Sequence, residues 1–430
     1  MSVSTLPDAL SPGAQLASAH ALKCRECGAL YPLDASYACF DCFGPLEVAY
    51  ASAAEGEPPV SREAIAAGPL SMWRYEAFLP VEPGAGARPG LQPGLTRLVR
   101  ADNLARALGA RTVWVKDDSG NPTHSFKDRV VAVALENARR LGYTTIACAS
   151  TGNLANAVAA AAARAGLESV VFVPSNLESG KIVTTAVYGG TLVAVDGNYD
   201  DVNRLCTEVA ATRDWGFVNV NLRPYYAEGS KTVGFEIAEQ LGWRLPDAVV
   251  SPVASGSLLT KVDKAFGEFV SHGLVASHDY QIFGAQASGC SPVSRAFSEG
   301  TDVIRPVRPD TIAKSLAIGN PADGPYALDV VRRTNGGMAD VTDAEIVEGI
   351  QLLAATEGIF AETAGGVVVA AYRKLLREGL IDPGAEVVLL NTGDGLKTLD
   401  AVAAVARPTI TIDPAYEAFQ TNYARVEAAR

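Results

Sequence analysis

Short apolar segments alternate with longer amphipathic segments from about Thr96 onward. The short segments have the length of buried strands, and the longer segments have the length of helices. Because alternating strands and helices are typical of βαβ units, we predict an α/β protein with parallel sheets. The expected strands are Thr112–Asp118, Thr144–Ala149, Ser169–Pro174, Thr191–Val195, Phe217–Asn221, Ala248–Pro252, Gln281–Gln286 and Glu386–Asn391. The expected helices include Asn153–Ala165, Val202–Arg213, Ser230–Leu241 and Leu258–Val270.

The composition is that of a globular protein with more than one domain. The chain has 430 residues, of which 48% are hydrophobic and 20% are charged, so it can form a large buried core. The net charge is −12 and basic tracts are lacking, which argues against binding to nucleic acid. The apolar runs are too short for a membrane span. No signal peptide is recognisable, so we expect a cytoplasmic protein without membrane partners.

Four of the seven cysteines form two pairs near the N-terminus. Cys24 with Cys27, and Cys39 with Cys42, each follow the spacing CxxC, and eleven residues separate the pairs. Four thiolates at this spacing can close a tetrahedral shell around a structural zinc ion. We therefore predict a zinc ribbon within residues 1–50. The alternative is a loop of four reduced thiols whose metal site is idle.

A polar turn with one lysine joins the strand Thr112–Asp118 to the helix-like run Ser125–Arg140. Residues 119–129 (SGNPTHSFKDR) place Lys127 near the start of this helix, which Ser125 could cap. A helix N-terminus disfavours an ammonium ion and so lowers the pKa of the lysine amine. A neutral amine can form a Schiff base with a carbonyl cofactor. The alternative is that Lys127 is a solvated helix residue.

Three further loops follow expected strands, at the sheet edge where α/β proteins bind their ligands. Ser150, Thr151 and Asn153 begin an Ala-rich helix, where hydroxyls and free backbone amides suit a carboxylate. Thr392 follows the last strand and could offer its hydroxyl to a ring nitrogen. A third loop consists of small residues before a helix, which suit a phosphate. These residues are Ala254, Ser255, Gly256, Ser257 and Leu258. Each loop alone also fits a helix cap or a glycine turn.

Together, the lysine and the three loops describe a cofactor with a carbonyl, a phosphate and a ring, as in pyridoxal phosphate. The motif 121–129 (NPTHSFKDR) resembles the Schiff-base lysine motif of fold-type II pyridoxal-phosphate enzymes, and most closely that of the threonine synthases. The stretches 317–321 (AIGNP) and 228–232 (EGSKT) are also similar to that family. The resemblance covers roughly residues 97–399, and some threonine synthases also carry an N-terminal cysteine ribbon.

The resemblance implies a role for each loop. Lys127 would bond to the cofactor, Asn153 would hydrogen-bond its phenolic oxygen, and Thr392 would face its pyridine nitrogen. Residues 254–258 would bind the cofactor phosphate. The substrate would need its own cations and hydroxyls, for which the candidates are Ser150, Thr151, Arg223 and Lys231.

The chain departs from the family pattern at several of these positions. Ala254 and Ser257 stand where glycines are common, which leaves the backbone amides available. His124 replaces a common glycine before the lysine, and we interpret it as a loop residue without a catalytic role. Leu154 replaces a common threonine after Asn153, which removes one hydroxyl from the expected substrate site.

The reaction implied by the resemblance converts O-phospho-L-homoserine and water into L-threonine and phosphate, the last step of threonine biosynthesis. The nearest alternatives are other fold-type II enzymes. A threonine or serine dehydratase would need no second phosphate site, and a cysteate synthase would use phosphoserine. An alternative of another class is a non-catalytic protein that senses a ligand with the same fold.

The resemblance also implies an architecture like that of the tryptophan synthase β subunit, with two parallel-sheet domains. We expect a large cofactor-binding domain in residues 96–137 and 229–406, and a small substrate domain in residues 138–228. Residues 51–95 would connect the ribbon to this body, and residues 407–430 would form a C-terminal tail. A homodimer is the family-based expectation.

Overall fold

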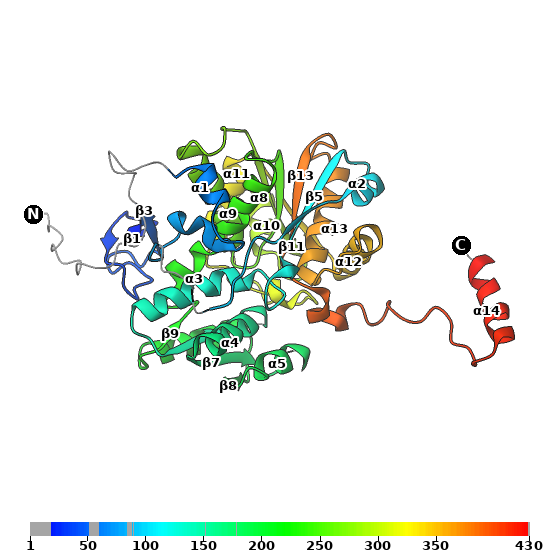
Figure 1. Cartoon of the computed structure of the whole chain (residues 1–430), viewed down its shortest axis with the longest axis horizontal. Helices are drawn as coiled ribbons and strands as arrows, with labels where there is room; N and C mark the ends of the chain where they lie inside the picture. The colour runs from blue at the N-terminus through cyan, green and yellow to red at the C-terminus, as the bar shows by residue number, and fades with distance from the viewer. Residues whose placement is uncertain are drawn as a thin grey trace, which may run out of the picture.

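Three sheets organise the part of the chain that the computed structural model describes, which comprises residues 19–50, 60–83, 88, 90–150, 152–177 and 179–428. A three-stranded sheet lies at the N-terminal side, a six-stranded sheet in the upper part of the body and a four-stranded sheet in the lower part (Figure 1). This arrangement confirms the predicted fold class of two mainly parallel sheets with a small N-terminal ribbon.

The six-stranded sheet has the order β12-β11-β10-β13-β5-β4. Its strands are parallel except at one edge, where β4 pairs with β5 antiparallel. The hydrophobic pattern does not predict β4 or β12, because each spans only four residues. The strands are β4 (Arg97–Arg100), β5 (Thr112–Asp117), β10 (Ala248–Pro252), β11 (Gln281–Ala287), β12 (Met338–Val341) and β13 (Glu386–Asn391).

The four-stranded sheet has the order β8-β7-β6-β9, and all its pairings are parallel. Its strands are β6 (Thr145–Ala149), β7 (Glu168–Pro174), β8 (Thr191–Val195) and β9 (Gly216–Phe217). The predicted strand Phe217–Asn221 is wrong beyond Phe217. The side chain of Asn221 accepts a hydrogen bond from the Phe217 backbone amide at 2.8 Å, which folds this segment into a turn.

The helices largely follow the predicted segments. Helix α4 has the predicted bounds, whereas α6 begins before the predicted Val202 because Asn198 and Asp201 form a capping box at its start. The α-helices are α1 (Arg62–Ala66), α2 (Asp102–Leu108), α3 (Lys127–Arg140), α4 (Asn153–Ala165), α5 (Ser179–Ala186), α6 (Tyr199–Ala210), α7 (Arg223–Glu228), α8 (Lys231–Gln240), α9 (Ser257–Ser271), α10 (Pro292–Ser298), α11 (Gly324–Arg333), α12 (Asp343–Glu357), α13 (Thr363–Arg377) and α14 (Tyr416–Ala428). The short 3₁₀ helices are η1 (Met72–Phe78), η2 (Asp118–Gly120), η3 (Lys314–Leu316) and η4 (Gly395–Ala401).

Helices cover both faces of the six-stranded sheet. Because successive side chains of a strand point to opposite faces, Val387 and Leu389 of β13 pack with α12 and α13. Val388 and Leu390 pack with α8 and α9 on the other face. A sheet that is buried on both faces accounts for the uninterrupted apolar runs of its strands.

The N-terminal sheet, called the ribbon below, comprises residues 19–50. Its strands β1 (Ala19–Cys24), β2 (Leu30–Tyr31) and β3 (Leu46–Tyr50) are antiparallel in the order β2-β1-β3. Leu22 and Val48 are buried in the same apolar cluster as Val131 of α3. The ribbon is therefore packed onto the body of the molecule, as Figure 1 also shows.

The sheets lie within the ranges predicted for the two domains. The strands of the six-stranded sheet fall in 96–137 and 229–406, and those of the four-stranded sheet fall in 138–228. The boundaries themselves stay predictions. The C-terminal helix α14 extends away from the body (Figure 1) and buries none of its residues. Among the described residues, no helix combines the length and the apolar character that crossing a membrane requires.

Candidate active site

Four strands of the two sheets end at one cavity. The loops after β5, β6, β10 and β13 supply its walls, which agrees with the expectation that ligands bind beyond the carboxyl ends of parallel strands. Most of the predicted site residues line this cavity. They are Lys127, Ser150, Asn153, Arg223, Ala254, Ser255, Gly256, Ser257, Leu258 and Thr392. Thr151 lies outside the described residues.

Lys127 is the first residue of α3 and faces the cavity. Its Nζ donates a hydrogen bond to the hydroxyl of Tyr226 at 2.8 Å. Burial lowers the pKa of Lys127 to about 8, although the carboxylate of Glu362 acts in the opposite direction. The predicted cap is wrong, because α3 has Phe126 at its N-cap and the hydroxyl of Ser125 is buried without a partner.

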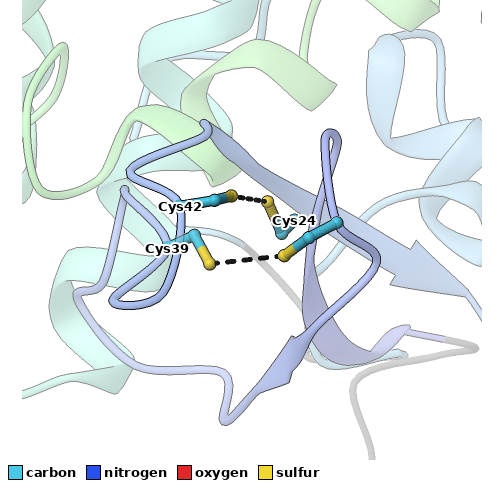
Figure 2. A group of neighbouring side chains, drawn as sticks. Cys24, Cys39 and Cys42 are labelled. Carbon is cyan, nitrogen blue, oxygen red and sulfur yellow. Dashed lines mark hydrogen bonds between the residues drawn. The ribbon is translucent and has the colours of Figure 1, made fainter.

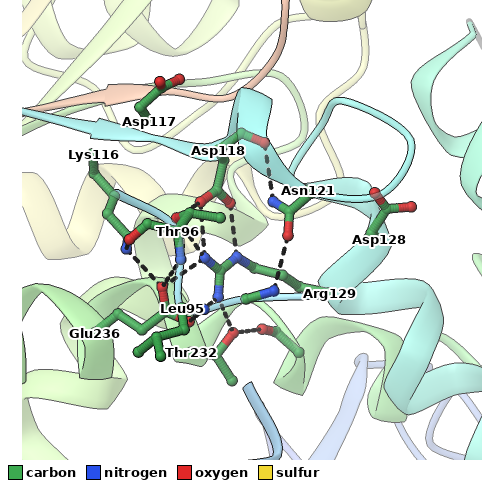
Figure 3. A network of polar contacts seen from close by, with 12 residues as sticks. Leu95, Thr96, Lys116, Asp117, Asp118, Asn121, Asp128, Arg129, Thr232 and Glu236 are labelled. Atoms are coloured by element: carbon green, nitrogen blue, oxygen red, sulfur yellow. Dashed lines mark hydrogen bonds and ion pairs between the residues drawn. The ribbon is translucent and has the colours of Figure 1, made fainter. Parts of the chain in front are cut away.

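A buried ion network fixes the helix that carries Lys127 (Figure 3). Arg129 donates to Asp118 Oδ2 from Nε at 2.7 Å and to Glu236 Oε1 from Nη1 at 2.5 Å. Lys116 of β5 donates to Glu236 Oε2 at 2.6 Å. The side chain of Asp128 accepts from the backbone amide of Thr123 at 2.7 Å. These contacts tie the turn 119–129 to β5 and α8, so the backbone on both sides of Lys127 is held in place.

In the loop after β6, the serine has a structural role. Ser150 Oγ accepts hydrogen bonds from the amides of Gly152 at 3.0 Å and Ala155 at 2.8 Å, which caps α4. Gly152 has a φ of 129°, and a Cβ there would lie 2.3 Å from the Cδ of Lys181. The positive φ favours glycine at this position, and any larger residue would also have to displace the Lys181 side chain.

A buried carboxylate joins the two residues that resemble cofactor ligands. Glu362 Oε2 accepts from Asn153 Nδ2 at 2.8 Å, and its Oε1 accepts from the hydroxyl of Thr392 at 3.2 Å. The Oδ1 atom of Asn153 is buried without a hydrogen-bond partner, as is the hydroxyl of Ser315, another residue of the cavity wall. Unpaired buried polar atoms are costly, so these two atoms of the cavity wall are suited to a polar ligand.

The loop after β10, residues 254–258, forms a cradle at the N-terminus of the 15-residue helix α9, a position that suits a phosphate. Gly256 has a φ of 103°, and a Cβ there would lie 2.7 Å from the carbonyl oxygen of Asp323. The backbone amide of Asp323 in turn donates to the carbonyl of Ser255 at 2.9 Å. The segment before α11 therefore packs directly under the cradle and fixes its shape.

The two predicted substrate cations have different environments. Arg223 lines the cavity, where its Nη2 lies 2.9 Å from Asp323 Oδ1 and its side chain is 27% exposed. The structure places Lys231 outside the cavity. Its buried Nζ lies 2.6 Å from the carbonyl of Phe78, 2.8 Å from Glu228 and 3.0 Å from Glu268. Lys231 therefore neutralises buried carboxylates. The prediction that Lys231 binds the substrate is wrong, because its amine is paired in the interior.

The four cysteines of the ribbon converge on one point (Figure 2). Their sulfur atoms all lie within 4.8 Å of one another. The Sγ atoms of Cys24 and Cys42 are 3.5 Å apart, and those of Cys27 and Cys39 are 3.6 Å apart. A tetrahedral zinc ion with Zn–S bonds of about 2.3 Å separates its sulfur ligands by about 3.8 Å. The cluster fits a structural zinc ion with four protein ligands.

Three polar cavity residues that contact the predicted ones escape prediction from the sequence. Tyr226 accepts the hydrogen bond of Lys127, Glu362 holds Asn153 and Thr392, and Asp323 supports the cradle and Arg223. Tyr226 stands two residues before the stretch 228–232, and Asp323 stands two residues after 317–321. For Tyr226 and Asp323, the position beside a recognisable motif is the available signal. Glu362 lies beside no such motif, and its contacts join distant parts of the chain.

The comparisons with known proteins agree with this geometry. Residues 91–393 match the family described as "Pyridoxal-phosphate dependent enzyme". A threonine synthase of Methanocaldococcus jannaschii is 37% identical over 393 residues, which cover 91% of this chain and 96% of the relative. A threonine synthase of Methanosarcina acetivorans is 36% identical, with coverage of 93% and 97%. Among solved structures, a diaminopropionate ammonia lyase from Escherichia coli has a TM-score of 0.63 at 20% identity and covers 80% of this chain and 92% of its own.

The residues of the cavity suit the chemical groups of pyridoxal phosphate. The cradle at Gly256 suits its phosphate, the amine of Lys127 suits its carbonyl, and the side-chain amide of Asn153, with its unpaired Oδ1, suits a polar ring. The solved structures, at identities below 25%, support the fold alone. The sequence relatives match almost the whole chain at 36–37% identity and therefore also show the family. The chain belongs to the threonine synthase family of pyridoxal-phosphate-dependent enzymes.

Proposed function

We propose that the protein converts O-phospho-L-homoserine and water into L-threonine and phosphate. The observation that carries this proposal is one cavity with a lysine amine, a phosphate cradle at α9 and a second cation, Arg223, on the same wall. Two anion sites beside one amine suit a phosphorylated amino acid in addition to the phosphorylated cofactor. The full-length matches to threonine synthases support the same choice.

Lys127 would move the protons of this reaction. Bound pyridoxal phosphate supplies a carbonyl that bonds to an amine and a ring that withdraws electrons from the substrate α-carbon. Burial lowers the pKa of Lys127 to about 8, so its amine, once released, is a suitable base for the α-proton near neutral pH. Tyr226, at 2.8 Å from Nζ, orients this amine toward the cavity.

Asn153 and Thr392 would hold the cofactor ring, and residues 254–258 would hold its phosphate. Glu362 accepts from both side chains, which fixes their orientation before a ligand arrives. Thr392 presents a hydroxyl to the ring, and a hydroxyl does not hold a ring nitrogen protonated as a carboxylate would. A ring whose nitrogen is not protonated withdraws electrons from the substrate less strongly.

The substrate would be held by other groups of the same cavity. The N-terminus of α4, with Ser150 and Thr151, suits the α-carboxylate or the substrate phosphate. Arg223 is the cation nearest to the cradle among the predicted substrate ligands, and it would bind the substrate phosphate. The balanced reaction breaks the bond between the γ-carbon and the ester oxygen, and the γ-carbon takes up a proton to become the methyl group. The β-carbon loses a proton and gains the hydroxyl of water, and the α-carbon loses and regains a proton. The remaining proton of water balances the charge of the released phosphate.

We further infer a homodimer and a cytoplasmic location from the family. The proposed division into a large domain, in residues 96–137 and 229–406, and a small domain, in residues 138–228, places the cavity between them. Movement of the smaller sheet would then exclude water until it is needed at the β-carbon.

The test is incubation of the purified protein with O-phospho-L-homoserine while phosphate release and the amino-acid product are both measured. The proposal requires threonine and phosphate in equal amounts. Phosphate with 2-oxobutyrate would identify a related elimination without hydration. Activity only on phosphoserine or serine would indicate a cysteate synthase or a dehydratase, and binding without any product would indicate a ligand sensor.

A further inference from the structure

The first cysteine knuckle of the ribbon touches the segment that supports the phosphate cradle. Arg25, between Cys24 and Cys27, places its guanidinium carbon 3.5 Å from the ring centroid of Tyr326 in α11. Its Nη1 lies 3.8 Å from Asp323 Oδ1. Glu26 accepts a hydrogen bond from the hydroxyl of Tyr326. The knuckle therefore contacts both the residue before α11 and the first turn of that helix.

Asp323 is the point at which the knuckle and the cavity meet. Its amide donates to the carbonyl of Ser255, and its carbonyl oxygen fills the space that a side chain at Gly256 would need. Its carboxylate binds Arg223 at 2.9 Å and lies near Arg25 at 3.8 Å, through the same oxygen atom. One carboxylate, 12% exposed, is thus shared by a cation of the cavity and a cation of the ribbon.

The opposite edge of the ribbon is attached to two other cavity elements. Glu47 of β3 lies 3.3 Å from Lys261 of α9, the helix behind the cradle. Tyr50 donates to Glu228 at the end of α7 at 2.7 Å, and Lys261 donates to the same residue at 2.6 Å. Helix α7 begins with Arg223. The ribbon therefore contacts α7, α9 and α11, the three helices beside Arg223 and the cradle.

We propose that the ribbon is a positioning element of the anion site, in which Arg25 acts on Arg223 through Asp323. When an anion draws Arg223 into the cavity, Asp323 would otherwise lose its closest cation. A largely buried carboxylate without a partner is costly. Because Arg25 already contacts the same oxygen, it can neutralise Asp323 while Arg223 turns to the ligand. This inference rests on the proposed function in taking the substrate phosphate as the ligand of Arg223.

The test compares Arg25→Ala with Arg25→Lys and with Lys23→Ala, which removes an exposed cation of β1 in the same ribbon. Arg25→Ala is expected to raise KM for O-phospho-L-homoserine by roughly two- to fivefold, the range of a partly exposed ion pair, with kcat unchanged. Arg25→Lys is expected to recover part of the loss because it keeps the charge. Zinc content must match that of the wild type in every variant, which excludes loss of the metal cluster as the cause.

A double-mutant cycle separates positioning from a general loss of stability. In the Arg223→Ala background, Arg25→Ala is expected to leave KM unchanged, because its effect passes through Arg223. The same variants are titrated with inorganic phosphate by calorimetry, which is independent of turnover. Equal effects of Arg25→Ala with and without Arg223, or an unchanged KM and phosphate affinity in the single variant, would overturn the inference.

The two proposals can fail separately. If the wild type forms no threonine but Arg25→Ala still weakens phosphate binding through Arg223, the proposed reaction is wrong and the positioning role stands. If the wild type forms threonine and Arg25→Ala behaves like Lys23→Ala, the reaction stands and the ribbon has no part in anion binding.

Discussion

Replacement of Arg129 by methionine would test whether the buried ion network holds the helix that carries Lys127. The Arg129 side chain is fully buried, and it lies 2.7 Å from Asp118 and 2.5 Å from Glu236. Methionine has a similar length but no charge, so among the described residues the variant leaves Lys116 as the cation near Asp118 and Glu236.

The expected loss of stability is large for a single residue. Removing one partner of a buried ion pair costs about 3–5 kcal/mol because the remaining charge stays buried. The pKa of Glu236 is consistent with this magnitude. Burial would raise it, but the charges of Arg129 and Lys116 outweigh that effect and lower the pKa to about 2 from 4.5. This group therefore stabilises the fold above pH 4.5, and that contribution disappears as the pH falls toward 2.

The assay is urea unfolding at neutral pH, with Arg97→Met as the matched control. Arg97 forms an ion pair of similar length, 2.6 Å to Asp117, but its side chain is 71% exposed. The buried Asp117 keeps its hydrogen bonds from Ser119 and Asn391 without Arg97, so the control should lose clearly less stability than Arg129→Met. In Arg129→Met, the pKa of Glu236 should rise. The difference in the free energy of unfolding between the wild type and the variant should therefore shrink as the pH is lowered. A loss in Arg129→Met no larger than that in Arg97→Met would refute the reasoning.

Further predictions concern the cofactor and the metal. The rate of pyridoxal phosphate uptake by the apoprotein should rise with pH and level off above about 8, where Lys127 loses its proton; a flat profile would contradict this. Lys127→Ala should fold, as judged by circular dichroism, and lose cofactor absorption and turnover. Gly256→Ala should weaken pyridoxal phosphate binding about tenfold or more in equilibrium dialysis, because the left-handed backbone and the contact with Asp323 both exclude a side chain. Zinc removal by a chelator should lower the melting temperature without a direct change in the cofactor spectrum, and a fully active preparation without metal would disprove a zinc site.

The features predictable from the sequence are those written in local patterns. Local patterns of a few residues predict the strand ends, the loop around Lys127, the cradle at 254–258 and the cysteine pairs. The chemistry of the loops became predictable only when they were considered together. Their convergence also followed from topology, because parallel strands bring their carboxyl ends to one edge.

The features missed depend on contacts between distant segments. Lys231 lies in a recognisable motif, yet its charge is used by Glu228 and Glu268 in the interior. Glu362 is separated from Asn153 by 209 residues, so nothing local links them. The contact between Arg25 and Asp323 spans almost 300 residues and becomes visible only when the ribbon is seen packed on α11.

The central claim is that phosphate leaves by elimination and that water adds to the β-carbon. The most direct test is the reaction of O-phospho-L-homoserine in water enriched in oxygen-18. The account predicts one solvent oxygen in the hydroxyl of threonine and none in the released phosphate, because the bond between carbon and oxygen breaks. Labelled phosphate together with homoserine would mean simple hydrolysis of the phosphate ester and would contradict the account.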